Sequence, residues 1–460
     1  MVVADLDQEA MKISRRNVLT APVAAPMLAQ QAARKPNLVF IISDDHSYPD
    51  LGCLGRPVTT PNLDRMASEG VRFDNCFVSS AQCSPNRSSI LTGCAPHTTA
   101  TSRLHTALPD YETTVVDLLK DAGYFAGAFR KVHQGASFDK RWNFYGSAAE
   151  PFSKFFDALP QGKPFYLHMG FTDPHRPYKR GKLPVTHEPS KVTVPAFLPD
   201  TPEIRDDIAD YYNSISRMDM ETGQLVELLR QRNLLDNTLI IFTGDNGMPF
   251  PGAKGTCYEP GIRVPLLVWW PGKMRGGSRR DELIAHVDLA SMWLDAAGIP
   301  QPKKMQGRSF LNLLTGAGAY TPREAVFAER NWHDNYDPIR AVRTRRHKLI
   351  FNALPQLPYR PIADLRDSPT WASYLGAARR AQLSPDHMRL HQPVRPVVEL
   401  YDLEKDPNEF HNLAENADYA KIREELKLLL SDWMHDTMDY LPPCFPRPGQ
   451  PAGRNWPMSL

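Results

Sequence analysis

Two short apolar runs restrict the fold more than any other feature of this chain. Residues 37–42 read NLVFII and residues 238–243 read TLIIFT. Continuous apolar runs rich in β-branched residues are typical of strands buried on both faces of a parallel sheet. Polar residues follow both runs, SDDH after the first and GDNG after the second. We therefore predict an α/β fold built on a large sheet flanked by helices.

The polar residues after the two runs form a candidate metal site. Asp44 and Asp45 follow the first run, and Asp245 and Asn246 follow the second. Open α/β sheets bind ligands at the carboxyl ends of their strands. An acidic turn would explain the first pair alone, but two such strand ends favour a hard cation that neutralises the carboxylates. Oxygen ligands without histidine or cysteine suit calcium or magnesium better than zinc.

Residues 83–93 read CSPNRSSILTG and place a cysteine at the start of a short helix. A proline near the first turn and a glycine after the last predict a helix from about Cys83 to Gly93. Cys83 would then lie at the positive end of the helix dipole, where anions bind readily. Arg87 lies one turn further and faces the same way. An ordinary buried cysteine at a helix start is the alternative from this stretch alone.

Four further side chains are candidates for the same site. Lys131 and His133 follow a strand predicted near residues 123–129, and they share a face if the segment stays extended. His175 lies between two prolines on the loop after another predicted strand. Lys254 lies on a loop rich in glycine and proline, from which it can reach an anion held by the metal.

The pattern C-x-P-x-R followed by S-x-x-L-T-G resembles the signature of the formylglycine-dependent sulfatases. With the segments around the acidic strand ends, Lys131 and His175, five motifs appear in that family's order, from residue 36 to about 440. One departure is Arg130, which replaces the first glycine of the family's G-K-x-H-x-G. The resemblance implies an alkaline-phosphatase-like sulfatase fold with a large mixed sheet and a smaller C-terminal domain.

The resemblance also implies a cofactor set. A maturation enzyme would oxidise Cys83 to formylglycine, and one calcium ion would be bound by the modified Cys83 and four other residues. Those four are Asp44, Asp45, Asp245 and Asn246.

In such a site a hydroxyl of the hydrated aldehyde attacks sulfur, activated by the metal and Arg87. Lys131 and Lys254 hold the sulfuryl oxygens, and His175 protonates the leaving group. His133 is expected to hydrogen-bond position 83. Weaker candidates for sugar contacts are Glu329, His333 and Arg103.

Four segments outside the generic motifs resemble the heparan N-sulfatase (sulfamidase) branch of the family. They are residues 194–202, 217–219, 242–251 and 399–402. The implied substrate is a sulfated oligosaccharide, with cleavage of the N-sulfate of glucosamine in heparin or heparan sulfate fragments. The alternatives are an O-sulfatase on a related sugar, a phosphodiesterase or phosphonate hydrolase of the same fold, and a glycan-binding relative that keeps its thiol.

The N-terminal segment suggests export. Residues 1–34 contain Arg15-Arg16 before a mildly apolar stretch, typical of a twin-arginine signal, with Met11 as the better start. We therefore expect a bacterial periplasmic or extracellular enzyme.

Residues 35–317 are predicted to form the catalytic domain, residues 318–440 a smaller α+β domain on an antiparallel sheet, and residues 441–460 a proline-rich tail.

Composition excludes several classes of protein. A formal charge of +2 gives no electrostatic case for nucleic-acid binding, and no apolar run reaches the roughly 18 residues of a membrane span. None of the six cysteines forms a CxxC pair, so zinc-ribbon and thioredoxin interpretations have no support. Residues 340–348 form a basic strand, read as a solvated face or as the lining of a groove for an anionic polymer. Nothing in the sequence indicates the oligomeric state.

Overall fold

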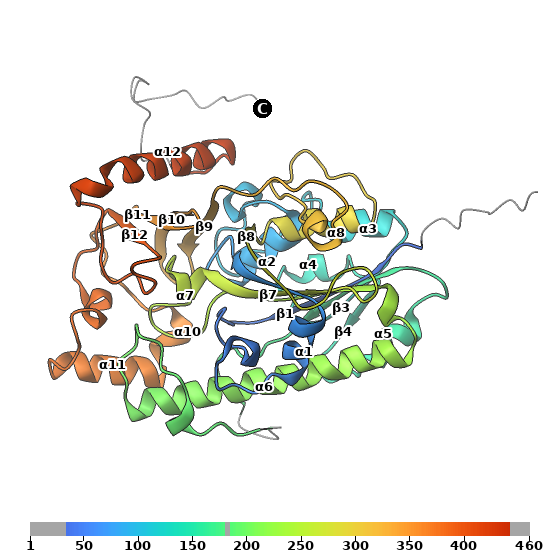
Figure 1. The fold of residues 1–460 in the computed structure, drawn as a ribbon, viewed down its shortest axis with the longest axis horizontal. Coiled ribbons are helices and arrows are strands. Elements are labelled where there is room, and N and C mark those ends of the chain that lie inside the picture. Colours follow the sequence, from blue (N-terminus) through green and yellow to red (C-terminus); the bar gives the residue numbers. More distant parts are fainter. Residues whose placement is uncertain (1–33, 180–184, 442–460) are drawn as a thin grey trace, which may run out of the picture. The chain divides into compact units, whose positions relative to one another are not determined.

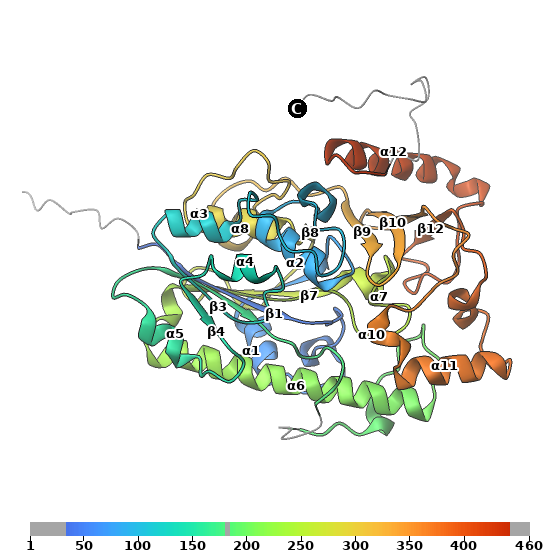
Figure 2. The same ribbon diagram turned by 180° about the vertical axis from the view of Figure 1, so that it is seen from behind.

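A computed structural model describes residues 34–179 and 185–441 of the chain. The predicted export signal, except Arg34, and the predicted tail, except Leu441, lie outside these residues. Figure 1 and Figure 2 show the ribbon from opposite sides.

An eight-stranded sheet carries the larger part of the fold. Its strand order is β4-β3-β5-β1-β6-β7-β2-β8, and β7 alone runs antiparallel to its neighbours. The strands are β1 (Asn37–Ser43), β2 (Val71–Phe77), β3 (Phe125–Arg130), β4 (Phe144–Gly146), β5 (Phe165–Gly170), β6 (Thr238–Gly244), β7 (Arg263–Trp269) and β8 (Ser278–Ala285). The large mixed sheet predicted from the sequence is therefore confirmed, and every residue of β1 and β6 is buried, as expected of central strands.

Helices cover both faces of this sheet because side chains alternate along each strand. Phe40 points to the face covered by α2, α3 and α8, whereas Val39 and Ile41 pack on the other side against α1 and α6. The two helical layers lie above and below the sheet in Figure 1. The helices are α1 (Pro61–Glu69), α2 (Cys83–Thr92), α3 (Val115–Asp121), α4 (Ala136–Asp139), α5 (Ser153–Ala158), α6 (Pro202–Gln231), α7 (Glu259–Ile262), α8 (Asp288–Ala296) and α9 (Leu311–Thr315).

A smaller antiparallel sheet occupies the C-terminal region, as predicted. Its order is β12-β11-β10-β9, with strands β9 (Val326–Trp332), β10 (Tyr336–Arg343), β11 (His347–Asn352) and β12 (Val398–Asp402). The helices of this region are α10 (Ala363–Arg366), α11 (Pro369–Arg379) and α12 (Ala420–Asp436). α12 packs on one face through Leu426 and Leu430, while the other face joins the main core through Ala341 and Ile350. The predicted boundary between residues 317 and 318 stays a prediction.

Two expectations for this region were wrong. Residues 340–348 were expected to form one basic strand, but a turn closed by the Thr344 N–H on the His347 carbonyl divides them between β10 and β11. The basic strand does not line a groove for an anionic polymer either. Arg340 and Lys348 are fully buried, where Arg340 pairs with Asp439, and Lys348 with two glutamates. These two cations are internal because each meets a carboxylate, whereas Arg345, on the turn between β10 and β11, is exposed as the solvated-face alternative expected.

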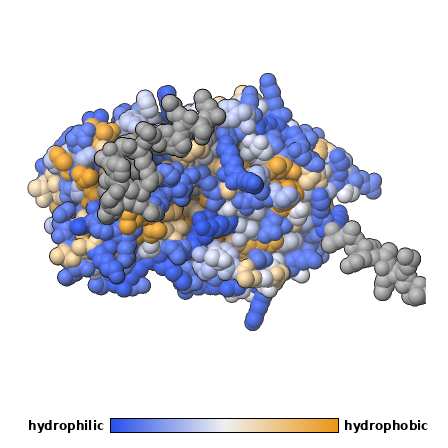
Figure 3. Space-filling view, turned by 90° about the horizontal axis from the view of Figure 1, so that it is seen from above, coloured by the Kyte–Doolittle hydropathy of each residue, from blue (hydrophilic) through white to orange (hydrophobic). Residues whose placement is uncertain are grey.

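Helices long and apolar enough to cross a membrane are absent from the part of the chain that the structure describes. The face shown in Figure 3 is mainly hydrophilic, with hydrophobic residues scattered over it in small areas. Within residues 34–179 and 185–441, every cysteine is a free thiol; these are Cys53, Cys76, Cys83, Cys94 and Cys257.

Candidate active site

The predicted site residues meet at one edge of the large sheet. Four adjacent strands, β3, β5, β1 and β6, run parallel, so their carboxyl ends lie side by side. Asp44 and Asp45 follow β1, Asp245 and Asn246 follow β6, and the loops after β3 and β5 carry the predicted lysine and histidines. The topology therefore brings segments far apart in sequence to one place, as the strand-end argument predicted.

Cys83 is the first residue of α2, as predicted, and the helix ends at Gly93 in a left-handed conformation with φ of 66°. The thiol is buried, and its Sγ donates to Asp44 Oδ1 at 3.3 Å and lies 3.9 Å from Asp45 Oδ1. Burial raises the pKa of the Cys83 thiol well above its usual value, although Lys131 and Lys254 oppose the shift. The sulfur therefore lies protonated against the carboxylate pair.

Arg87 is buried behind Cys83 and links two strand ends. Its Nε donates to Asp245 Oδ2 at 2.7 Å, and its Nη1 donates to the Lys131 carbonyl at 2.6 Å. Its Nη2 has no hydrogen-bond partner and lies 4.0 Å from Asp44 Oδ1. One guanidinium edge is therefore fixed, while Nη2 remains available on the side of Asp44.

Two lysines neutralise the carboxylate pair. Lys131 Nζ donates to Asp44 Oδ2 at 2.5 Å, and the fully buried Lys254 lies 2.8 Å from Asp45 Oδ1. Burial alone would raise the pKa of Asp44, but Lys131, the neighbouring histidine and Arg87 hold it well below its usual range. Asp44 is therefore ionised, as a metal ligand must be.

Asp364, on α10, is a site residue that the sequence did not reveal. Its Oδ2 accepts from Lys254 Nζ at 2.7 Å and lies 3.4 Å from His175 Nε2 and 3.6 Å from His333 Nε2. Burial and Lys254 lower the pKa of His175, but Asp45 and Asp364 outweigh them and raise it. No motif marks Asp364, because it lies on a short helix of the C-terminal region that meets the site only in the folded chain.

His133 does not make the expected contact. Its Nε2 is hydrogen-bonded to His105 Nδ1 at 2.7 Å. Within the described residues no hydrogen bond joins His133 to Cys83. Burial and the cations Lys131 and Arg87 lower the pKa of His133 to about 3, so it stays neutral. Arg130 has a left-handed φ of 62°, which explains why the resembling motif has glycine there.

The donor set fits a divalent cation. Asp44, Asp45, Cys83 and His175 place potential ligand atoms within 4.8 Å of one another. The buried Asn246 Oδ1 has no hydrogen-bond partner, which suits a metal ligand. Burial and Asp44 raise the pKa of Asp245 to about 6, so that carboxylate would be stabilised by a nearby cation. Oxygen donors dominate this set, as calcium and magnesium prefer.

A cleft of about 610 Å³ opens onto Cys83 and is lined by Lys131, His133, His175 and Asp364 among others. The weaker sugar-contact candidates are placed differently. Glu329 is fully buried and hydrogen-bonds to Asn331, so it cannot face a sugar. The Arg103 guanidinium stacks over Trp332 at 4.8 Å, and the buried His333 reaches the cleft only through Asp364.

Comparison with known proteins identifies the family. The sulfatase family model matches residues 36–161 and 140–299. This chain belongs to the sulfatase family. Sulfatases hydrolyse sulfate esters and generally use a formylglycine and a divalent metal, for which the site described above provides the residues. A second model, N-sulphoglucosamine sulphohydrolase, C-terminal, matches residues 253–380.

Individual relatives differ in their substrates. Human N-sulphoglucosamine sulphohydrolase is 30% identical, over 88% of this chain and 91% of that protein. An ulvan-active sulfatase of Formosa agariphila is 28% identical, over 87% of this chain and 75% of that protein.

Solved structures support the fold. A protein solved with its substrate D-glucosamine-2-N,6-O-disulfate matches with a TM-score of 0.67 at 20% identity, over 89% of this chain and 99% of that one. The phosphonate monoester hydrolase of Agrobacterium radiobacter matches with a TM-score of 0.68 at 18% identity, over 88% of this chain and 96% of that one. Both fit the alkaline-phosphatase-like fold expected from the sequence.

Proposed function

We propose that this sulfatase acts on sulfated glycans and releases the N-sulfate of glucosamine from heparin or heparan sulfate fragments. The observation that carries the sulfatase chemistry is Cys83 at the start of α2, in contact with Asp44 and surrounded by Arg87, Lys131 and Lys254. An anionic sulfuryl group fits a site with this many fixed cations.

The chain's own residues have separate tasks. Residue 83, oxidised by a maturation enzyme to formylglycine and hydrated, would supply a nucleophilic hydroxyl. Asp44, Asp45, Asp245 and Asn246 would hold a calcium ion, which would supply Lewis-acid charge stabilisation. The Lys131 and Lys254 ammonium groups, already at the carboxylate pair, bind and orient the sulfuryl oxygens.

His175 is the proton donor for the leaving group. Its Nε2 faces the cleft between Asp45 and Asp364, and those carboxylates favour the protonated ring. An amine departs far more readily once protonated, so this proton matters for an N-sulfate substrate.

The N-sulfate preference is supported by the 30% identity to human N-sulphoglucosamine sulphohydrolase and by the match of residues 253–380 to that enzyme's C-terminal model. Residues 253–380 include both Lys254 and Asp364, which line or approach the cleft. We further propose that the enzyme is exported to the periplasm or the extracellular space, where such fragments are encountered.

Sulfate release from three sugars tests the proposal. N-sulfoglucosamine should be turned over faster than 6-O-sulfated N-acetylglucosamine and a 2-O-sulfated uronate disaccharide. Faster turnover of either O-sulfated sugar would make the enzyme an O-sulfatase instead. Faster turnover of a phosphonate monoester than of all three sugars would overturn the sulfatase assignment.

A further inference from the structure

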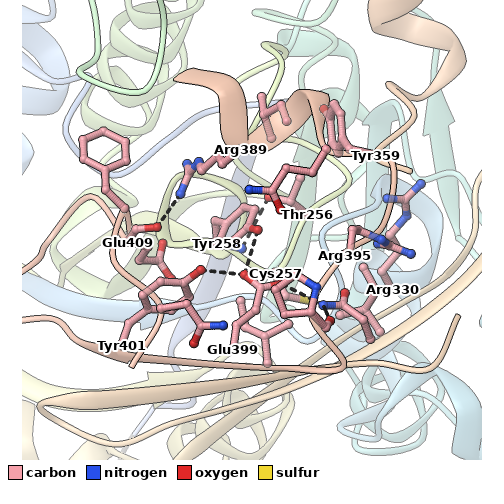
Figure 4. A pocket seen from close by; sticks show the side chains of 18 residues that line it. Thr256, Cys257, Tyr258, Arg330, Tyr359, Arg389, Arg395, Glu399, Tyr401 and Glu409 are labelled. Carbon is pink, nitrogen blue, oxygen red and sulfur yellow. Dashed lines mark hydrogen bonds between the residues drawn. The ribbon is translucent and has the colours of Figure 1, made fainter. Parts of the chain in front are cut away.

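A second cavity lies between the small antiparallel sheet and the segments that follow α11. It offers about 90 Å³, more than the minimum that one water needs. Figure 4 shows its wall, with Arg389 beside Glu409 on one side, Tyr258 in the middle, and Arg330 and Arg395 together on the other side. This concentration of arginines is unusual for an internal space, because a buried charge is costly unless it is paired.

Arg389 has no carboxylate partner within the described residues. Its guanidinium stacks over Tyr258 at 4.4 Å and Phe410 at 5.3 Å, and Nη1 donates to the carbonyls of Asn408 and Glu409. Its Nε and Nη2 are buried without a hydrogen-bond partner. These two N–H groups form one edge of the guanidinium, the edge that binds an oxyanion through two parallel hydrogen bonds.

Arg330 provides a further donor. It is 2% exposed, it lines the same cavity, and its Nε has no hydrogen-bond partner. Its Nη1 lies 3.1 Å from Asp337, but Asp337 also pairs with Arg395 at 2.6 Å, so two arginines share one carboxylate. The group of three arginines is therefore short of negative charge.

The carboxylates on the cavity wall are occupied by other partners. Glu399 accepts from Asn352, Tyr258 and Tyr401 at 2.6–2.9 Å. Glu409 pairs with Lys348 at 2.5 Å and accepts from a backbone N–H. Neither of them compensates Arg389 or Arg330.

We propose that this cavity binds a small oxyanion, of the size and charge of sulfate or phosphate, between Arg389 and Arg330. Residues on the cavity wall adjoin the loop that carries Lys254 of the Cys83 site. Thr256, on its wall, is two residues from Lys254, and Tyr359, also on its wall, accepts a hydrogen bond from the Gly252 N–H at 3.1 Å. A bound anion would therefore stabilise the loop that carries Lys254. This binding does not depend on the proposed substrate.

Crystals of the full chain soaked in selenate, a sulfate analogue, test the site directly. We expect an anomalous peak in the cavity within hydrogen-bond distance of Arg389 Nε and Nη2. The cavity filled by water alone, with selenate only at the Cys83 site, would overturn the proposal.

Thermal unfolding with sulfate, phosphate and chloride provides a second readout in solution. Sulfate should raise the unfolding midpoint of the wild type more than that of Arg389→Gln. The control Arg345→Gln, an exposed arginine on the turn between β10 and β11, should respond as the wild type does. Sulfate bound at the Cys83 site contributes equally to all three proteins, so the difference reports the cavity.

Arg389→Lys separates oxyanions from halides and serves if the glutamine variant fails to fold. It keeps the charge but loses the two-pronged edge, so it should lose most of the sulfate and phosphate response. Equal responses to sulfate in the wild type and in both Arg389 variants would contradict the proposal. A response to chloride alone would show a halide site instead.

Discussion

Replacing Asp364 by asparagine should impair catalysis although no motif marks this residue. Asp364 is the second carboxylate partner of the buried Lys254, at 2.7 Å, and it faces His175 Nε2 at 3.4 Å. Asparagine keeps the shape and removes the charge. Lys254 would then turn fully toward Asp45, and His175 would lose one of the two carboxylates that favour its protonated form.

The expected magnitude follows from these contacts. A hydrogen bond to a charged group contributes about 1.5–3 kcal/mol. The Asp364 side chain is 24% exposed, so we take the lower part of that range, about 1.5–2 kcal/mol. Each 1.36 kcal/mol is a factor of ten, so the rate should fall about 10- to 30-fold.

Steady-state sulfate release gives the test. The loss should fall mainly on kcat, because the lysine and the histidine act on charge that develops during reaction. Asp367→Asn, an exposed carboxylate three residues further on, should leave both constants unchanged. A kcat for Asp364→Asn within twofold of the wild type would refute the assigned role.

Three further changes have defined outcomes. Asp245→Asn, or exhaustive chelation of divalent metals, should abolish sulfate release, and full activity in either assay would rule out the metal site. Asparagine is preferred over alanine because its amide oxygen can still accept the hydrogen bond from the buried Arg87 Nε. Asp439→Ala should lower the free energy of unfolding by about 3–5 kcal/mol because it leaves Arg340 buried and unpaired, whereas a loss below about 1 kcal/mol in denaturant titration would contradict this. Burial raises the pKa of Asp50 from 3.8 to about 6, so ionisation of Asp50 destabilises the fold as pH rises from about 4 to 6. The free energy of unfolding of Asp50→Asn should therefore exceed that of the wild type by up to roughly 2–3 kcal/mol at pH 7 and by little at pH 4. An equal difference at both pH values would contradict the shift.

Local signals were sufficient to predict the elements that carry the site. The runs that became β1 and β6 are apolar throughout because both faces of these strands are covered, so their buried nature is visible in sequence. The two ends of α2 are signalled by Pro85 in its first turn and by Gly93 directly after its last residue. Once these strands were assigned to one sheet, Asp44 and Asp245 had to meet at its carboxyl edge.

The remaining features depend on packing that a single sequence does not encode locally. A buried Arg340 and an exposed Arg345 look alike in sequence, and the carboxylate partner of Arg340 lies about a hundred residues away at Asp439. His133 was expected to contact Cys83, but its left-handed backbone turns the ring toward His105. Of the predicted site residues, Asp44, Cys83, Lys131, His133 and His175 thus line one cleft, while the individual contacts were only partly foreseen.

The mass of one tryptic peptide tests the chemistry at residue 83 most directly. Cleavage after Arg72 and Arg87 releases a peptide with two cysteines, of which Cys76, on β2, lies outside the oxidation motif and serves as an internal control. In protein that releases sulfate, Cys76 should alkylate as a thiol, while residue 83 should have the mass of an aldehyde and react with a hydrazide. An active preparation in which both cysteines alkylate at full occupancy would contradict the proposed mechanism.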